Sequence, residues 1–195
     1  MRGLLIAFEG LDQSGKQTQA ERVRDRLVGS GRVVELLSFP AYHTPIGFEI
    51  RQALEGTRRW RADVMQLLYI ANRYEAKPRI EDALARGTIV VCDRYVASSV
   101  AYGESQGLDA EWLHDIQRYL PQPDLTILLD IAPEVSAQRK TAGRDAYERD
   151  LALLARVRVS YLSQARARGW LLLDASRDRE KIASEIFEAL EPLLR

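Results

Sequence analysis

A glycine-rich segment near the start of the chain has the residue pattern of a loop that binds phosphate groups. It runs from Gly10 to Lys16 and fits G-x-x-x-x-G-K. The glycines let the backbone curl until its N–H groups point at phosphate oxygens, and Lys16 adds a compact positive charge for the outer phosphates. We therefore expect nucleotide phosphates to be bound by the following residues: Gly10, Leu11, Asp12, Gln13, Ser14, Gly15, Lys16, Gln17 and Thr18.

The residues on either side of this loop supply the context that the pattern needs. Residues 4–8 are five consecutive apolar residues, which predict a strand buried on both faces. Residues 17–28 predict a helix, and its N-terminus adds partial positive charge at the same place. A strand before the loop and a helix after it favour a phosphate site over an ordinary glycine-rich turn.

Two residues are candidate ligands of Mg²⁺. The phosphate-loop pattern has Ser or Thr after the lysine, because that hydroxyl holds the metal. This chain has Gln17, whose carboxamide oxygen can also bind Mg²⁺ but lies further out on a longer side chain. Asp93 follows the apolar run at residues 88–92, where an acidic side chain beside a phosphate loop can hold Mg²⁺ through water.

Several arginines could bind phosphate groups. The planar guanidinium of Arg94 can hold a phosphate through two parallel hydrogen bonds, although a structural ion pair with Asp93 is the alternative. Residues 138–149 are rich in cations and predict a mobile loop that closes over a polyphosphate, against the alternative of a solvated connection between helices. Arg156 and Arg158 beyond it are expected at the surface.

The elements that must position these residues alternate along the chain. Apolar runs predict strands at residues 4–8, 33–39, 88–92, 125–129 and 170–173. Helical patterns lie at residues 17–28, 45–55, 63–86, 95–101, 109–119, 133–140, 147–168 and 180–194, with Pro78 expected to kink or split the helix at 63–86. This alternation predicts an α/β fold, in which a five-stranded parallel sheet is flanked by helices on both faces and binds ligands at the carboxyl ends of its strands.

Composition limits the function classes. The 195 residues suit one domain, and 28 basic against 28 acidic residues argue against a broad nucleic-acid or membrane surface. Cys92 is the one cysteine, which excludes an intrachain disulfide. Residues 1–3 lead directly into a core strand and no stretch has the length of a membrane span, so we expect a cytoplasmic protein.

The motifs and their order resemble the thymidylate kinase family, whose members phosphorylate dTMP with ATP. The resemblance covers nearly the whole chain. Its matching segments are FEGLD at residues 8–12, GKQTQ at 15–19, Phe39-Pro40, ANRYE at 71–75, DRY at 93–95 with Ser98-Ser99 and Ala101-Tyr102, QGL at 106–108, Pro123-Asp124, and LLDA at 172–175.

The resemblance implies a P-loop nucleoside monophosphate kinase fold over residues 1–195, with a lid at about residues 139–149. It implies ATP and Mg²⁺ as cofactors and dTMP as the substrate. Asp12 would contact the sugar of the monophosphate, and Arg94 would grip its phosphate. The remaining substrate residues would be Phe39 in the base pocket, Tyr69 stacked on thymine, Arg73 hydrogen-bonded to the base, and Ser98 and Tyr102 along the thymine and sugar.

This chain departs from the family pattern at sites that bear on catalysis. Some members carry a catalytic arginine in the phosphate loop, at the position of Gln13 here, so the lid residues Arg144 and Arg139 become the candidates. Residues 41–43, after Phe39-Pro40, offer no arginine near the transferred phosphate, and Gly103 follows Tyr102 where the family usually has Gln. With Lys16, Asp12 and Arg94, the two lid arginines complete the predicted catalytic set.

We expect a dTMP kinase that binds neither nucleic acid nor membrane and forms a homodimer, as the family generally does, through apolar faces near residues 45–55, 64–71 and 96–101. Two alternatives remain open from the sequence. One is a P-loop kinase of another or modified deoxynucleoside monophosphate. The other is a nucleotide-binding relative with impaired catalysis, to which Gln17 in place of Ser or Thr gives some support.

Overall fold

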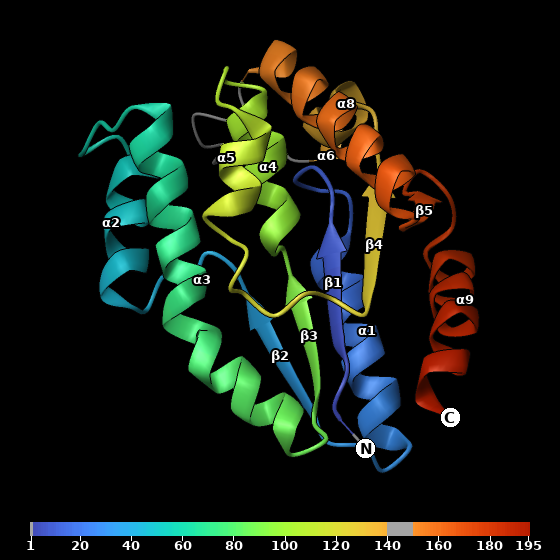
Figure 1. Cartoon of the computed structure of the whole chain (residues 1–195). Helices are drawn as coiled ribbons and strands as arrows, with labels where there is room; N and C mark the ends of the chain where they lie inside the picture. Colours follow the sequence, from blue (N-terminus) through green and yellow to red (C-terminus); the bar gives the residue numbers. More distant parts are fainter. Residues whose placement is uncertain (1, 140–149) are drawn as a thin grey trace.

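The computed structural model describes residues 2–139 and 150–195 and contains one sheet of five parallel strands in the order β2-β3-β1-β4-β5 (Figure 1). The strands are β1 (Leu5–Glu9), β2 (Val34–Ser38), β3 (Ile89–Asp93), β4 (Leu125–Asp130) and β5 (Leu171–Asp174). Helices cover both faces of the sheet, so the expected α/β fold class is confirmed.

The helices described are α1 (Lys16–Gly29), α2 (Pro45–Leu54), α3 (Ala62–Ala85), α4 (Val96–Glu104), α5 (Ala110–Asp115), α6 (Pro133–Arg139), α8 (Leu151–Arg168) and α9 (Arg179–Leu190), followed by the short 3₁₀ helix η1 (Glu191–Leu194). In Figure 1, α1 and α9 lie behind the sheet, and α3, α4 and α8 lie in front of it. None of the helices in the described part of the chain is long and apolar enough to cross a membrane.

The first strand is buried on both faces, as its apolar run predicts. Ile6 and Phe8 belong to a core cluster that also contains Val23 of α1. Leu5 and Ala7 point the other way, into a second cluster formed with α3 and β3. Successive side chains of a strand alternate between the two faces, so one strand supplies both cores.

Helix α3 continues through Pro78 as one helix, and its ribbon changes direction along its length (Figure 1), so of the two effects expected of Pro78 it is the split that does not occur. Two other helices differ from the sequence prediction. The helix expected at residues 109–119 ends at Asp115 and continues as tighter i→i+3 turns. The closing helix changes to 3₁₀ form after Leu190, where Pro192 cannot continue the α-helical ladder. Residues 147–149, expected to begin the long helix, lie outside the described residues.

Parallel pairing brings all five strand ends to one edge of the sheet. Phe8 pairs in register with Asp93, and Asp130 pairs with Asp174. Residues that directly follow the strands are therefore neighbours in space although they are far apart in sequence. This edge is where an open parallel sheet binds its ligands.

Candidate active site

The phosphate loop connects β1 to α1 at the ligand-binding edge. Gly10 and Gly15 have φ angles of 138° and 90°, which side chains of other residues rarely allow. At Gly10 a Cβ atom would also lie 2.4 Å from the carbonyl oxygen of Leu129 on β4. Gln13 adopts a φ of 61° without being glycine, so the loop is held in a strained form of the kind found at ligand sites.

Lys16 is the first residue of α1 and is almost completely buried, with 5% of its surface exposed. Its Nζ donates a 2.7 Å hydrogen bond to the carbonyl oxygen of Leu11 in the loop. Burial, and then the positive charge of Arg94, lower the pKa of Lys16 to about 8, whereas the nearby carboxylates act in the opposite direction. The loop thus contains a buried ammonium group whose charged form phosphate would stabilise.

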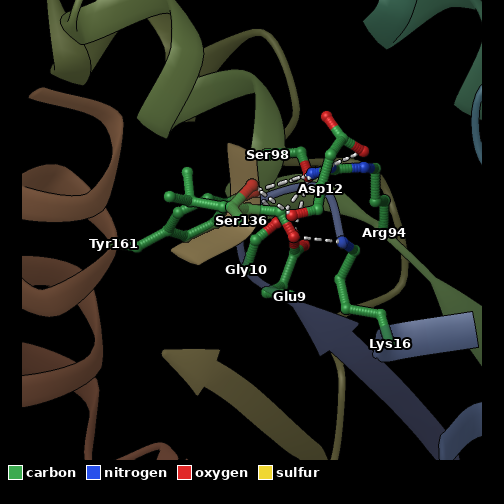
Figure 2. Close-up of polar contacts among 9 residues, drawn as sticks. Glu9, Gly10, Asp12, Lys16, Arg94, Ser98, Ser136 and Tyr161 are labelled. Carbon is green, nitrogen blue, oxygen red and sulfur yellow. Dashed lines mark hydrogen bonds and ion pairs between the residues drawn. The ribbon is translucent and has the colours of Figure 1, made fainter. Parts of the chain in front are cut away.

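Arg94 contacts the same loop (Figure 2). Its Nη1 donates to the carbonyl oxygen of Gly10 at 3.0 Å, and its Nη2 donates to Oδ1 of Asp12 at 2.8 Å. Burial is the largest single influence and opposes the charge, but Asp12, Tyr102 and Tyr161 together raise the pKa of Arg94 well above its ordinary value. The backbone of Arg94 has a φ of 63°, and this conformation directly follows β3.

Glu9 fixes the hydroxyl groups behind Arg94. It is fully buried and accepts hydrogen bonds from the backbone N–H of Tyr95 at 2.8 Å, from Ser98 at 2.7 Å and from Tyr161 at 3.1 Å. The two hydroxyls lie 3.4 and 3.3 Å from Nη1 of Arg94 and 2.8 Å from each other (Figure 2).

Tyr161 comes from α8, far along the chain, and sequence reasoning missed it. Burial, followed by the negative charge of Glu9, raises the pKa of Tyr161 well above its ordinary value, so it remains a neutral hydroxyl. Its helix has the apolar and polar residues of an ordinary amphipathic helix, and a tyrosine in such a helix is usually interpreted as core packing.

One pocket brings together all seven residues that the sequence assigned to the substrate. It is a cleft with about 520 Å³ of empty space, which includes open solvent. Its lining consists of Asp12, Phe39, Pro40, Tyr42, Leu54, Gln66, Tyr69, Arg73, Arg94, Ser98, Ser99 and Tyr102. Sequence reasoning did not assign Gln66 or Ser99 to this pocket.

Arg73 does not lie on a solvated helix face. It is 2% exposed and points from α3 into the pocket wall, where Nη1 donates to Oγ of Ser99 at 2.7 Å and to the carbonyl oxygen of Tyr69 at 3.2 Å. Burial lowers the pKa of Arg73, and the charge of Glu9 partly offsets this. Its guanidinium carbon lies 6.0 Å from the centre of the Phe39 ring.

The two candidate magnesium ligands differ in their surroundings. Oδ1 of Asp93 is buried and has no hydrogen-bond partner among residues 2–139 and 150–195, which fits a group that holds a hydrated cation. Gln17 is exposed, and its amide nitrogen donates to Glu21 one turn along α1. The described residues contain no cluster of three or more His, Cys, Asp or Glu side chains placed to bind a metal.

A second hollow lies beside the phosphate loop. It is lined by Ser14, Gly15, Thr18, Gln19, Leu129, Arg139, Ala175, Arg177, Asp178, Arg179 and Ile182. Arg139 at the end of α6 bridges its walls, donating to the carbonyl oxygens of Gln13 and Ala175 at 3.0 Å each. Arg144, the other candidate catalytic arginine of the lid, lies outside the described residues.

The expectation that Arg158 is a surface residue is wrong. It is half-buried on α8, and its Nε and Nη2 bind the two carboxylate oxygens of Asp130 at 2.7 Å each. The bidentate contact raises the pKa of Arg158. Asp130 ends β4, so this pair fixes α8 to the ligand-binding edge. Arg156 is exposed, as expected.

Comparison with known proteins gives a consistent result. The family model described as thymidylate kinase matches residues 8–186. A thymidylate kinase of Schizosaccharomyces pombe is 35% identical over 192 residues, covering 96% of this chain and 91% of that protein. The human thymidylate kinase is 32% identical, covering 100% of this chain and 92% of that protein. A solved structure of thymidylate kinase from Candida albicans, whose title reports a broad substrate specificity, aligns with a TM-score of 0.82 and 30% identity over 98% of this chain and 92% of that one.

Proposed function

The chain belongs to the thymidylate kinase family, and from that membership we propose how its residues divide the work of the reaction. The protein transfers the γ-phosphoryl group of ATP to dTMP and gives dTDP and ADP. A kinase of another monophosphate and a relative with impaired catalysis are not favoured, because the named relatives that match most of this chain are thymidylate kinases. We assign the activity to one kinase domain over residues 1–195.

We propose that Lys16 and Arg94, two cations that contact the same loop, bring the reacting phosphates together. Lys16 and Arg94 donate to the adjacent carbonyl oxygens of Leu11 and Gly10, and this shared attachment is the observation that carries the proposal. Lys16 and the backbone N–H groups of residues 10–18 bind the phosphates of ATP, whereas Arg94 binds the phosphate of dTMP. Little covalent chemistry is required of the protein in phosphoryl transfer, so positioning and charge supply most of the catalysis.

The pocket next to Arg94 would hold the nucleoside of dTMP. Asp12 would contact the sugar, and its carboxylate also keeps the Arg94 guanidinium in place. Phe39, Tyr69 and Arg73 would surround the thymine, and Ser98 and Tyr102 would line the thymine and sugar. The support for this division is that all these side chains line one pocket.

We propose Mg²⁺ as the second cofactor, held by Asp93 through water, with Gln17 as a further oxygen donor. When bound, Mg²⁺ neutralises charge on the transferring phosphates. The support is the buried, unpartnered Oδ1 of Asp93. The Gln17 amide nitrogen donates to Glu21 on the exposed surface of α1, so Asp93 is the stronger assignment.

The test of these assignments is a coupled assay of ADP release. With MgCl₂ and ATP, dTMP should give the highest kcat/KM among dTMP, dUMP, dCMP, dGMP and dAMP. An excess of EDTA should remove activity, and added MgCl₂ should restore it. Equal rates on dTMP and dCMP would contradict the thymine pocket, and full activity in EDTA would contradict the metal assignment.

We propose that lid arginines supply the positive charge that Gln13 cannot supply. Arg139 already contacts the carbonyl oxygen of Gln13, which keeps a cation beside the phosphate loop. Replacing Arg139 or Arg144 with alanine should lower kcat by about 10- to 1,000-fold for the residue that contacts the transferring group. Turnover that stays unchanged in both variants would show that the lid assignment is wrong, and Arg166→Ala, an exposed site near the end of α8, is the control.

We also propose a cytoplasmic homodimer that forms through α2 and α3. Phe48 on α2 is 51% exposed and Leu67 on α3 is 46% exposed, and these helices pack against each other. The third expected face, at residues 96–101, is wrong as a dimer surface, because residues 97–101 are buried within the chain by packing of α4 against α8. Light scattering should give twice the 22.1 kDa mass of the chain.

A further inference from the structure

Gln66 lies in the wall of the substrate pocket with its side-chain amide entirely unpaired. The residue is 1% exposed. Neither Nε2 nor Oε1 has a hydrogen-bond partner among residues 2–139 and 150–195. A buried amide without partners destabilises the folded protein, so a donor and an acceptor placed together at a pocket wall call for a ligand that pairs with both.

The position of Gln66 on α3 directs it toward the same ligand as its neighbours. Gln66, Tyr69 and Arg73 are spaced at i, i+3 and i+7, so they share one face of the helix, and all three line the pocket. The Nη1 of Arg73 is used by protein acceptors, but its Nε is buried and has no partner among the described residues. This face therefore offers two unpaired donors and one unpaired acceptor to a single ligand.

Space for the Gln66 side chain depends on the glycine at position 103. A Cβ atom at Gly103 on α4 would lie 3.3 Å from Cγ of Gln66 and 2.5 Å from Cδ1 of Leu113. A larger residue at position 103 would therefore require the side chains of Leu113 and Gln66 to shift. The absence of a side chain at Gly103 on α4 thus leaves the space that the Gln66 side chain of α3 occupies.

We propose that Gln66 is a specificity-determining residue that reads the N3–H group of the thymine base. Thymine presents an N3–H donor between two carbonyl acceptors, and the unpaired groups on α3 offer the complementary acceptor and donors. Oε1 of Gln66 accepts from N3–H, and Nε2 donates to a neighbouring carbonyl oxygen of the base. The inference rests on the proposed placement of dTMP in this pocket and goes beyond it by assigning the central contact to Gln66.

The test compares dTMP with its N3-methyl analogue, in which a methyl group replaces the hydrogen of N3–H, so that the base keeps both carbonyl groups but can no longer donate from N3. The parent enzyme should have a kcat/KM for the analogue that is lower by about 5- to 100-fold, because Oε1 of Gln66 remains unpaired. Gln66→Met, which keeps the length of the side chain and removes the amide, should lower kcat/KM for dTMP by a similar factor. The same substitution should lower kcat/KM for the analogue little further.

A matched control is Gln117→Met. Gln117 is also buried, at 3% exposure, and its Oε1 is also unpartnered among the described residues, but it lies outside this pocket. In this control, the ratio of kcat/KM for dTMP to kcat/KM for the analogue should change by less than 2-fold. Thermal unfolding of ligand-free Gln66→Met should occur at the parent temperature or above it, because two unpaired polar atoms have been removed.

Two results would overturn the proposal. One is a parent enzyme that uses both substrates equally, which needs no variant to observe. The other is an equal loss on both substrates in Gln66→Met with a lower unfolding temperature, which would identify Gln66 as a packing residue. Either result leaves dTMP kinase activity in place, whereas a parent that fails to phosphorylate dTMP would instead contradict the proposed function.

Discussion

Replacing Lys16 with methionine is expected to lower kcat for dTMP phosphorylation by about 10²- to 10³-fold. The ammonium is buried at the start of α1 and donates to the carbonyl oxygen of Leu11, so it is positioned before any phosphate arrives. Methionine keeps the unbranched stem and removes only the charge, and its burial carries no desolvation cost. The fold should therefore survive, and thermal unfolding should show a midpoint at or above that of the parent.

The control for this loss is Lys181→Met, which removes a lysine from the exposed surface of α9. Its kcat should stay within about 2-fold of the parent, since an exposed charge contributes little to a buried site. Steady-state kinetics with saturating dTMP and varied ATP gives kcat and KM for ATP. A Lys16→Met enzyme with the kcat of the parent would contradict the assignment of Lys16 to the ATP phosphates.

The pKa of Lys16 gives a second measurement on the same residue. In the folded, ligand-free protein this pKa is about 8, below the ordinary 10.5, so between these values the folded state binds fewer protons than the unfolded state. Stability due to this group should therefore rise with pH across that window. Phosphate oxygens favour the charged ammonium and raise its pKa, so nucleotide binding should take up a proton above pH 8 and weaken as pH rises further.

Calorimetry of ADP binding at pH 7 and at pH 9, in buffers of different ionisation enthalpy, measures this proton uptake directly. The parent should take up close to no proton through Lys16 at pH 7 and a measurable fraction at pH 9. In Lys16→Met, proton uptake on ADP binding should be the same at the two pH values. The backbone N–H groups of the loop should still bind ADP weakly. Equal proton uptake in the parent and the variant would assign the titration to another group.

Local sequence signals were sufficient for the parts of the site that lie within one loop or follow one strand. Gly10 and Lys16 belong to a single contiguous pattern, and the apolar run before them places that pattern at a strand end. Parallel strands then require Asp93 and Arg94 to lie at the same edge of the sheet. The fold class followed from the same alternation of apolar runs and helical patterns.

Residues that act across the fold were not predictable in this way. Tyr161 reaches Glu9 across 152 positions of sequence, and its helix gives no local sign of a polar contact. Arg158 has a charged side chain on an amphipathic helix, and only the position of Asp130 shows that it is not a solvated residue. The unpaired amide of Gln66 is a property of packing, because it depends on the space left by Gly103.

Replacing Arg94 with methionine is expected to raise KM for dTMP by about 100-fold and to lower kcat/KM by about 10²- to 10³-fold or more. Arg94 is the cation that Glu9, through Ser98 and Tyr161, and Asp12 all hold in one orientation. Its loss removes both the charge and the planar pair of donors that can bind a phosphate. The apparent affinity for ATP should change much less, because Lys16 and the loop N–H groups remain.

The contrast between the two variants is the sharper test. Lys16→Met should mainly affect ADP binding and Arg94→Met should mainly affect dTMP binding, each measured by calorimetry with one ligand at a time. Arg79→Met, which removes a surface ion pair with Glu35, is the matched control and should alter neither. Because the two cations contact neighbouring carbonyl oxygens, a site with one shared phosphate would instead make both variants lose the same ligand. That outcome would contradict two separate phosphate positions on the loop. Loss of ADP binding in Lys16→Met and of dTMP binding in Arg94→Met would support the in-line arrangement that phosphoryl transfer needs.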